Sequence, residues 1–574
     1  MNLSNVTQYG VFLLLLIALV KPVGIYLARV FESRTAPLDS VLGPIERAIY
    51  RLAGVDARQE MSWKRYSASF LLFSFAGTLL LYLILRIQPF GHPADPAFHP
   101  VPLTPDLAMN TAISFATTTT WQAYGGETTM SYVSQVVGLA AQNFLAGAAG
   151  LAVGMAFIRG LARQRSGTIG NFWVDLTRSI LWVLLPLSIV GALVLVWQGV
   201  PQNWSPYVSV TTLQGAQQTL PQGPVAALEF IKNLGTNGGG FFNANGAHPY
   251  ANPTPLTNLL GLLAIAVLPA GLTYTFGRMT GHQRHGWLLF IVMVLLFSGG
   301  LAVCDRAEQT GNPRISALGV DQAVGSMQAG GNMEGKETRF GIGGSVLATV
   351  VTSNGATGSV SAMHDSYTPI GGGLAIFDML LGEAIFGGLG TGIYSMVMIV
   401  LVAVFIGGLM IGRTPEYLGK TLNPVEIKLI ALYTIIGPLF VLPLTAIALI
   451  THAGLEGLTT NTGPHGFSEI LTAYVTSMAN NGQNFAGLSV NSAFYNVTTA
   501  IAMVAGRYWL AIPALALAGQ FAAQGNRPQN SGTLPTDTPL FGGLVIASML
   551  IIGGLSYLPA LAMGPIVEHL LLHP

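Results

Sequence analysis

Apolar residues fall in long runs along the chain, and short polar segments separate these runs. We expect apolar spans at about 9–29, 66–87, 129–158, 173–197, 256–277, 286–304, 374–410, 427–450, 488–518 and 540–563. Each run is close to or above the length of about 20 residues that an α-helix needs to cross a bilayer. The pattern therefore predicts an all-α polytopic membrane protein with about ten transmembrane helices.

The amino-acid composition also supports a membrane protein. Of the 574 residues, 51% are hydrophobic and 9% are charged, whereas soluble proteins carry about 25% charged residues. The formal net charge is +1, which predicts no nucleic-acid partner. We expect membrane lipid to surround the chain.

Lysine and arginine indicate the orientation of the predicted helices. They are frequent between the first two spans and at later loops on the same side, but the opposite loops near 90–116, 198–228 and 451–470 contain neither. By the positive-inside rule, the amino terminus and these three loops face outward.

Four polar clusters follow apolar stretches of about 10 to 15 residues, which are too short to span a bilayer and are typical of re-entrant helices. The clusters are "TTTTWQAYGGE" from Thr117, "GTNGGGFFN" from Gly235, "TSNGATG" from Thr352 and "TSMANNGQN" from Thr476. If Thr118, Asn237, Asn354 and Asn480 are equivalent, the spacings are 119, 117 and 126 residues. A unit of helix, half-helix, polar loop and helix therefore repeats four times.

The repeat divides one transmembrane domain, residues 1–574. We expect an extra first helix and cytoplasmic loop at 1–65, repeats at 66–165, 166–285, 286–426 and 427–525, and an extra last helix at 526–574. An acidic residue precedes each loop, and near the amino terminus of a half-helix it would interact favourably with the helix dipole. These residues are Asp106, Glu229, Glu337 and Glu469; ordinary surface carboxylates are the alternative.

The four loops have the composition of an ion filter. A filter replaces the hydration shell of a cation with backbone carbonyls, and glycine allows the unusual dihedrals that this requires. The loops are almost uncharged, which favours a large monovalent cation over Ca²⁺ or Mg²⁺. Potassium is the ion we expect, and a set of extracellular turns is the alternative.

Several longer motifs carry a family resemblance. They are "TTTTWQAYGGETTMSYVSQ", "LGTNGGGFFNANGAHPYANPTPLTN", "SAMHDSYTPIGG", "GRTPEYLGK" and "ANNGQNFAGL". Together they resemble the potassium-binding subunit of the bacterial Kdp potassium-transporting ATPase, from the first helix to the last. Thr118 stands where the family pattern has Asn and Asn354 where it has Cys, departures that bear on affinity more than on function.

The resemblance implies the fold of the superfamily of potassium transporters, in which four helix–pore helix–filter loop–helix repeats surround one pore. It implies K⁺ as the transported ion. The filter contacts that it implies are Thr118, Thr119, Gln122, Thr236, Asn237, Gly238, Ser353, Asn354, Gly355, Asn480, Asn481 and Gly482.

The same resemblance implies a subunit of a complex in the bacterial inner membrane. Its partners would be a P-type ATPase catalytic subunit and small accessory membrane subunits, and potassium would leave the filter through a lateral tunnel for high-affinity, ATP-driven uptake. No "DKTGT" motif occurs, and "GKT" at Gly419 lacks the earlier phosphate-loop glycine, since position 414 is Thr. We therefore expect no nucleotide and no ATP hydrolysis on this chain.

Two features fit a lateral path. The stretch "GEAIFGGLGTG", Gly382 to Gly392, interrupts the seventh span and predicts an intramembrane loop that includes Gly387 and Gly388. Arg507 would place a positive charge inside the ninth span, where it would block direct passage while Glu383 attracts the ion. An Arg507–Glu383 pair that only ties helices together is the alternative.

The sequence leaves two other kinds of transporter open. One is a cation-coupled secondary transporter, in which broken helices bind substrate near the midplane. The other is a potassium channel-like uptake protein gated by a cytosolic subunit. His364 and Asp365 in "AMHDSY" suggest a metal pair, but without further ligands nearby we expect them to brace the loop that follows the third cluster.

Overall fold

The computed structural model of the chain describes residues 3–32, 37–88, 98–325, 328–410, 412, 414–527 and 534–572. Within these ranges ten helices are long and apolar enough to cross a membrane, which confirms the predicted class. They are α1 (Leu3–Phe31), α3 (Trp63–Arg86), Ser134–Ala162 with α6 (Ala141–Ala162), Phe172–Trp197 with α7 (Phe172–Arg178) and α8 (Leu185–Trp197), α10 (Pro255–Thr280), α11 (Gln283–Gln309), α15 (Thr391–Met410), α16 (Pro424–Ile450), Ala493–Ala523 with α19 (Ala493–Val504) and α20 (Leu510–Ala523), and α21 (Pro539–Leu561).

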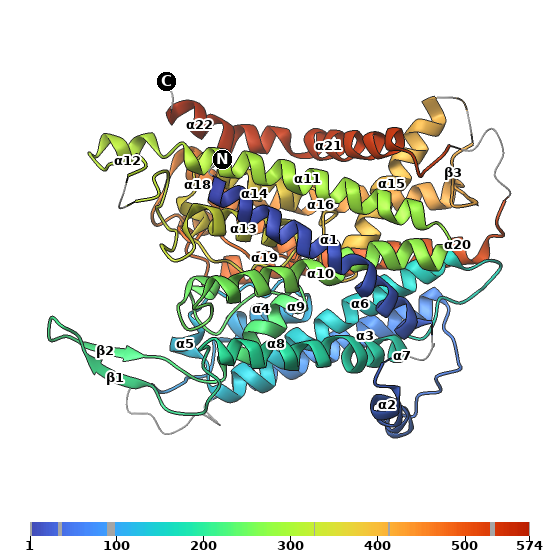
Figure 1. The fold of residues 1–574 in the computed structure, drawn as a ribbon, viewed down its shortest axis with the longest axis horizontal. Helices are drawn as coiled ribbons and strands as arrows, with labels where there is room; N and C mark the ends of the chain where they lie inside the picture. The colour runs from blue at the N-terminus through green and yellow to red at the C-terminus, as the bar shows by residue number, and fades with distance from the viewer. Residues whose placement is uncertain are drawn as a thin grey trace.

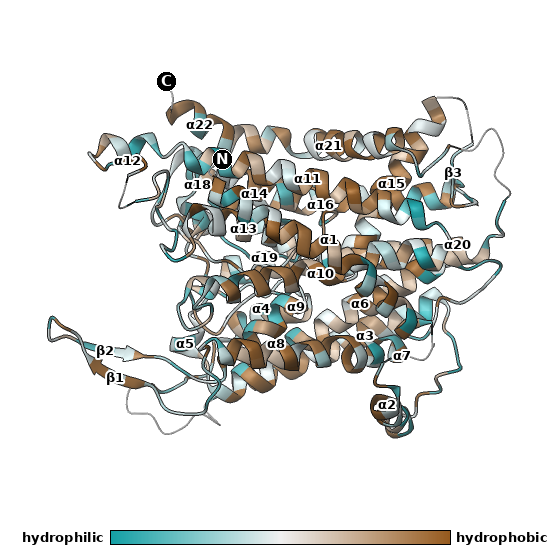
Figure 2. Ribbon diagram, viewed as in Figure 1, coloured by the Kyte–Doolittle hydropathy of each residue, from teal (hydrophilic) through white to brown (hydrophobic). Residues whose placement is uncertain are grey.

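The long helices lie side by side in one bundle (Figure 1). Brown apolar residues cover their lengths, while the polar, teal residues gather in the connections at both ends of the bundle (Figure 2). This distribution is what a helical membrane protein requires, because every backbone polar group inside the bilayer must be satisfied within the protein.

Four of the long helices contain a π-helical turn. The turns are Ser134–Ala140, Ser179–Leu184, Ala505–Trp509 and Ala562–Ile566. The third turn carries Arg507. Such turns interrupt regular helical hydrogen bonding and are frequent at functional sites.

The four predicted half-helices are confirmed and have 10 to 16 residues. They are α4 (Pro105–Ala116), α9 (Val225–Leu234), α13 (Gly341–Asn354) and α18 (Gly463–Met478). At about 1.5 Å per residue, none of them is long enough to cross about 30 Å of hydrocarbon. All four lie in the half of the bundle that also holds the β1–β2 hairpin (Figure 1).

The expected acidic residues at the half-helix amino termini are only partly found. Asp106 lies in the first turn of α4, and Glu337 lies just before α13, where its carbonyl accepts a hydrogen bond from the backbone N–H of Gly341. The expectation is wrong for Glu229 and Glu469, which lie past the first turn of α9 and α18. Glu229 instead forms a buried 2.8 Å ion pair with Lys232 one turn later.

The predicted interruption of the seventh span is also confirmed, although its boundaries change. A separate helix, α14 (Pro369–Leu380), precedes the break, and residues 381–390 are irregular. Only α15, which begins at Thr391, has the length of a membrane span. The sequence merged these helices because residues 374–381 continue the apolar run.

The remaining elements are short and connect or cover the bundle. They are α2 (Asp39–Ala53), α5 (Gly126–Thr129), α12 (Pro313–Ala317), α17 (His452–Leu455), α22 (Val567–Leu572), the 3-10 turns Asn245–Ala247 and His364–Ser366, and strands β1 (Val208–Thr211), β2 (Gln217–Leu220), β3 (Glu416–Tyr417) and β4 (Lys420–Thr421).

The strands form two antiparallel hairpins, in which Val208 faces Leu220 and Glu416 faces Thr421. An all-α prediction did not include them. Within the "GKT" stretch, the Lys420 ammonium donates to the carbonyls of Arg163 and Gln524, which directly follow α6 and α20. Lys420 therefore joins two helix ends at the side of the bundle opposite the half-helices.

Candidate functional site

Each half-helix ends in a short loop, and the four loops share one backbone pattern. We define loop 1 as residues 117–122, loop 2 as 235–240, loop 3 as 355–360 and loop 4 as 479–484. The second and fourth residue of every loop has a positive φ: Thr118 64° and Thr120 51°, Thr236 51° and Gly238 87°, Ala356 47° and Gly358 69°, Asn480 48° and Gly482 85°. Alternation between left-handed and ordinary dihedrals turns successive carbonyls toward one side of the chain, as a carbonyl-lined site requires.

The four loops close into a ring at the fourth position. A methyl group added at Gly238 would lie 1.7 Å from the Thr357 carbonyl oxygen of loop 3, and one added at Gly358 would lie 2.1 Å from the Asn481 carbonyl oxygen of loop 4. The corresponding distance from Gly482 to the Thr119 carbonyl oxygen of loop 1 is 1.9 Å.

The last contact of the ring runs from loop 1 to loop 2. There the fourth position is Thr120, and its hydroxyl donates a 2.5 Å hydrogen bond to the Asn237 carbonyl oxygen. Each loop thus contacts the third residue of the next, in the order 1, 2, 3, 4 and back to 1. Glycine is required where backbone meets backbone this closely, and its positive φ adds to that requirement.

The structure places most of the predicted filter residues in these loops. Thr118, Thr119, Thr236, Asn237, Gly238, Asn480, Asn481 and Gly482 occupy the second to fourth positions of loops 1, 2 and 4. All of them except Gly238 and Gly482 are polar side chains that are at most 6% exposed.

The structure does not place the residues predicted for loop 3 at the second to fourth positions of that loop. Ser353 and Asn354 belong to the last turn of α13, and Gly355 is the residue that follows the helix. The residues equivalent to Asn480, Asn481 and Gly482 are Ala356, Thr357 and Gly358. The sequence analysis took Asn237 and Asn354 as the equivalents of Thr118 and Asn480, whereas the structure places Thr236 and Ala356 there. Matching Gly358 to Gly238 and Gly482 would have found the register of the structure. Thr120, which occupies the same position in loop 1, was not among the predicted contacts.

Polar side chains brace the ring from outside. The Asn480 amide donates to the Thr119 hydroxyl at 2.9 Å and the Asn481 amide to the Thr352 carbonyl at 2.8 Å. Gln122 accepts a 2.8 Å hydrogen bond from the backbone N–H of Gly240. The Gln122 side chain therefore joins loop 1 to loop 2. The sequence analysis predicted that Gln122 contacts the ion, whereas in the structure its side chain contacts a neighbouring loop.

One carboxylate of the outer connections, that of Glu127, follows loop 1 closely in the chain. Glu127 in α5 accepts a hydrogen bond from the Asn243 backbone N–H at 2.8 Å, which connects the segments that follow loops 1 and 2. Burial raises the pKa of Glu127 above its usual range.

The irregular segment 381–390 packs directly against the ring. The backbone N–H of Leu389 donates to the Thr236 hydroxyl at 2.7 Å, and a methyl group added at Gly388 would lie 3.5 Å from the Ala356 side chain. A methyl group at Gly387 would collide with the Glu383 carbonyl oxygen at 1.6 Å. Gly387 and Gly388 thus form a tight turn beneath loops 2 and 3.

Arg507 is buried beside this turn. Its guanidinium donates to the Ala146 carbonyl at 3.1 Å and to the Thr391 hydroxyl at 3.3 Å, and Nε has no partner among the described residues. Glu383 is 7% exposed and accepts a hydrogen bond from the backbone N–H of Gly388. The described residues provide no carboxylate that forms an ion pair with Arg507, so the tying pair with Glu383 is not present.

A cavity of about 110 Å³ lies next to Glu383 and Thr391. It runs between α14, α15, α16, α18 and α21, and its polar lining includes Ser395, Tyr433 and Tyr557. It provides space for water-sized groups.

A family model and curated relatives assign the chain to the same protein family. Residues 10–570 match the family model described as "KdpA: Potassium-transporting ATPase A subunit". A potassium-transporting ATPase potassium-binding subunit of Methylorubrum extorquens is 52% identical over 572 residues, which cover 99% of this chain and 98% of the relative. The protein of the same name from Sorangium cellulosum is 50% identical over 585 residues, with 99% of each chain covered.

Among solved structures, the chain is similar to the potassium transporter TrkH from Vibrio parahaemolyticus. The TM-score is 0.51 at 13% sequence identity, and the match covers 89% of this chain and 97% of that chain. This likeness shows a shared fold. The family match over nearly the whole length shows more: the chain belongs to the family of potassium-transporting ATPase A subunits.

Proposed function

We propose that this chain binds extracellular potassium in the ring of four loops and passes it sideways through the membrane to a P-type ATPase partner. The observation that carries the proposal is the closed ring, in which four loops with the same alternating dihedrals contact one another in order. The family relationship supports the same ion, because the relatives are named potassium-binding subunits.

The chemistry of the ring favours potassium over smaller or divalent ions. Its available ligands are backbone carbonyls and neutral Thr and Asn side chains, without a carboxylate in loops 1 to 4. Such ligands suit a weakly hydrated monovalent cation, whereas Ca²⁺ and Mg²⁺ need carboxylates or retain their water.

The proposed ion contacts are the second, third and fourth residues of each loop, as the structure aligns them. They are Thr118, Thr119 and Thr120 in loop 1, Thr236, Asn237 and Gly238 in loop 2, Ala356, Thr357 and Gly358 in loop 3, and Asn480, Asn481 and Gly482 in loop 4. Gln122 braces the ring. Ser353 and Asn354 support loop 3 from α13, and the Asn354 amide donates to the buried Asp378 at 2.9 Å.

The proposed path leaves the axis below the ring. No carboxylate in the described part of the chain lies within ion-pair distance of Arg507, although Glu383 is near enough for the two charges to interact. A buried cation repels potassium strongly because the protein interior screens charge poorly. Glu383 faces the cavity of about 110 Å³ and attracts the ion, while the Gly387–Gly388 turn closes the direct exit. The cavity between α15 and α16 is then the first part of the lateral path.

The rest of the assembly is proposed on the family relationship. The chain is a non-hydrolytic subunit without a nucleotide site, in a complex with the catalytic P-type subunit and small accessory membrane subunits. It lies in the bacterial inner membrane with its amino terminus outside. Residues 66–165, 166–285, 286–426 and 427–525 are the four repeats, flanked by 1–65 and 526–574.

Thermal unfolding of the purified chain in detergent tests the ring. A ligand that binds only the folded state stabilises it by RT ln(1 + [L]/Kd). We expect potassium and rubidium, but not sodium at equal ionic strength, to raise the Tm, and Gly238→Asp to lose this response. Equal responses to all three ions in wild type and variant would exclude the ring as the ion site and favour a secondary transporter.

Co-purification tests the partner. A P-type ATPase chain should accompany this chain after extraction in a mild detergent. A soluble nucleotide-binding protein in its place would instead favour a channel gated from the cytosol.

A further inference from the structure

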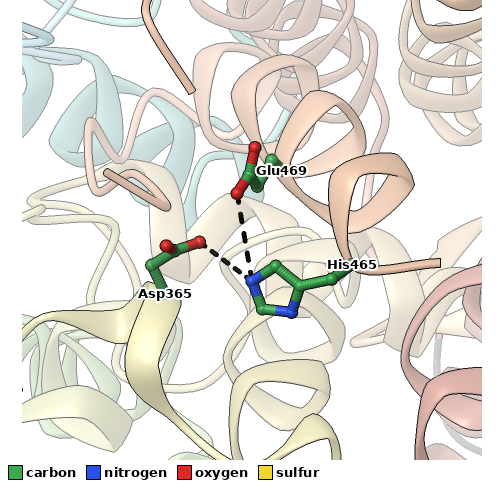
Figure 3. Close-up of side chains that lie close together, drawn as sticks. All are labelled: Asp365, His465 and Glu469. Carbon is green, nitrogen blue, oxygen red and sulfur yellow. Dashed lines mark hydrogen bonds and ion pairs between the residues drawn. The ribbon is translucent and has the colours of Figure 1, made fainter. Parts of the chain in front are cut away.

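Four titratable side chains from three separate segments meet beside the ring. Asp365 lies in the turn His364–Ser366 that follows loop 3, His465 and Glu469 lie one turn apart on α18, and Glu568 lies in α22. Figure 3 shows Asp365 and Glu469 facing the same ring nitrogen of His465. The sequence placed no further ligand near Asp365, because the others follow it by about 100 to 200 residues.

His364, the other member of the sequence pair, has a different role. Its Nε2 lies 3.0 Å from the Thr349 hydroxyl on α13, so it joins the segment after loop 3 to the half-helix. Asp365 is therefore the residue of this pair that joins the cluster.

The hydrogen bond to Glu568 orients the imidazole of His465. His465 Nδ1 lies 2.9 Å from Glu568 Oε1, which is the distance of an N–H donor from a carboxylate. Its Nε2 lies 3.0 Å from Asp365 Oδ1 and 4.0 Å from Glu469 Oε1. If the only ring proton is on Nδ1, the Nε2 lone pair faces two carboxylate oxygens, and a positive charge must lie between them. That charge is either a second ring proton, with which Nε2 donates to Asp365, or a bound metal ion.

Glu469 provides an independent observation. It is 1% exposed, and its Oε2 has no hydrogen-bond partner among the described residues. Its Oε1 accepts one hydrogen bond, at 2.8 Å, from the Asn461 amide. A buried carboxylate with an unused oxygen is costly unless a proton or a bound cation compensates its charge.

We propose that Asp365, His465 and Glu469 form a binding site for a divalent transition-metal ion such as Zn²⁺, with Glu568 as the residue that orients His465. One ligand atom from each of the three lies within 4.8 Å of the others. Two ligands of a tetrahedral zinc ion are about 3.3 Å apart when the bonds are about 2.0–2.1 Å, so small side-chain shifts suffice. A carboxylate on the second nitrogen is the usual partner of a metal-bound histidine.

The ligand set selects the class of metal. One imidazole nitrogen with two carboxylate oxygens suits zinc and its first-row neighbours, whereas Mg²⁺ and Ca²⁺ prefer oxygen ligands alone. The metal would join the turn after loop 3, the start of α18 and the carboxyl-terminal helix α22. The site is distinct from the potassium ring and does not depend on the proposed function.

Zinc binding to the purified, chelator-treated chain tests the site. The protein is prepared without a histidine tag, titrated with ZnCl₂ by calorimetry, and analysed for retained zinc by mass spectrometry after desalting. We expect one zinc per chain, and binding at least about tenfold weaker in His465→Gln and Glu469→Gln. Glu568→Gln keeps the three ligands and should weaken binding by about 10 to 100-fold.

A matched control is available on the same side of the protein. His452 and Glu456 form an exposed pair with the same four-residue spacing, at 2.9 Å, so His452→Gln should bind zinc as wild type does. Visible absorption of bound Co²⁺ gives a second readout of the coordination. Absence of retained zinc in the wild type, or equal binding by wild type and His465→Gln, would overturn the proposal and leave a protonated His465 as the cation between the carboxylates.

Discussion

The Thr120 hydroxyl donates a hydrogen bond to the Asn237 carbonyl oxygen at 2.5 Å. Among the four contacts made by the fourth residue of each loop, it is the one that uses a side chain, because glycine occupies this position in loops 2, 3 and 4. The ring is therefore asymmetric, with one adjustable contact and three fixed by backbone.

Replacement of Thr120 tests that contact. Thr120→Val removes the donor but keeps the shape, and we expect it to lower the free energy of unfolding by about 1–3 kcal/mol, as when a buried acceptor loses its partner. Thr120→Ser keeps the donor and should stay close to wild type. Thermal unfolding with and without potassium measures both effects; a Val variant as stable and as potassium-responsive as the Ser variant would mean that the hydrogen bond contributes nothing.

Gly482→Ala tests the backbone contacts. The new methyl group would lie 1.9 Å from the Thr119 carbonyl oxygen, so loop 1 or loop 4 must move. We expect a lower Tm and loss of stabilisation by potassium.

A matched control separates this collision from backbone strain. Gly215 in the β1–β2 hairpin has a φ of +83°, close to the +85° of Gly482, but no atom within 4 Å of an added methyl group. Gly215→Ala should therefore cost only about 1–2 kcal/mol of left-handed strain and keep the potassium response. Identical behaviour of the two variants would argue against a tight ring.

Substitution of Arg507 tests the barrier below the ring. Arg507→Met removes the charge at similar volume, and we expect passive potassium flux into liposomes to rise by about tenfold or more, because a barrier change of only about 1.4 kcal/mol has that effect. Arg507→Lys keeps the charge, so its passive potassium flux should stay as low as that of wild type. If passive potassium flux through the Met variant is as low as through wild type, the positive charge is not the barrier.

His248, in the segment after loop 2, makes the stability of the protein depend on pH. Its ring stacks on Phe242 at 3.7 Å, and its Nδ1 accepts a hydrogen bond from the Tyr250 backbone N–H. Burial, and after it the charge of Arg339, lowers the pKa of His248 to about 4. Between the ordinary pKa of about 6.5 and this value, the unfolded chain binds more protons, so stability falls as the pH decreases.

The measurement is the Tm between pH 4 and pH 7. His248→Gln cannot titrate, so its Tm should decrease less toward low pH than that of wild type, while the exposed His452→Gln should follow wild type. Parallel curves for wild type and His248→Gln would show that other groups cause the acid sensitivity.

The sequence by itself determined the class of protein and the order of its elements. Apolar runs of about 20 residues can be satisfied only as spanning helices, so all ten spans were predictable. The half-helices were predictable because they are apolar but too short, and loops 1, 2 and 4 because Thr, Asn and Gly gather where those helices end. The glycines of residues 382–392 likewise predicted the break before Thr391.

Only the tertiary structure decided where the loops meet. The end of α13 at Asn354 depends on packing and not on residue type, and it moved the register of loop 3 to Ala356, Thr357 and Gly358. The contacts between Gly358 and Asn481, or between Leu389 and Thr236, join residues more than 100 positions apart. No local pattern encodes such contacts, since they arise when four half-helices converge on one axis.

The same reason explains the cluster around His465. Asp365 offered one ligand in the sequence, Glu469 was expected near the amino terminus of a half-helix, and nothing in the sequence connected His465 or Glu568 with them. The packing of α18 and α22 against the turn after loop 3 brings them within a few ångströms. Local composition thus determined which segments enter the membrane and how they are shaped, and long-range packing decided which of their polar groups face one another.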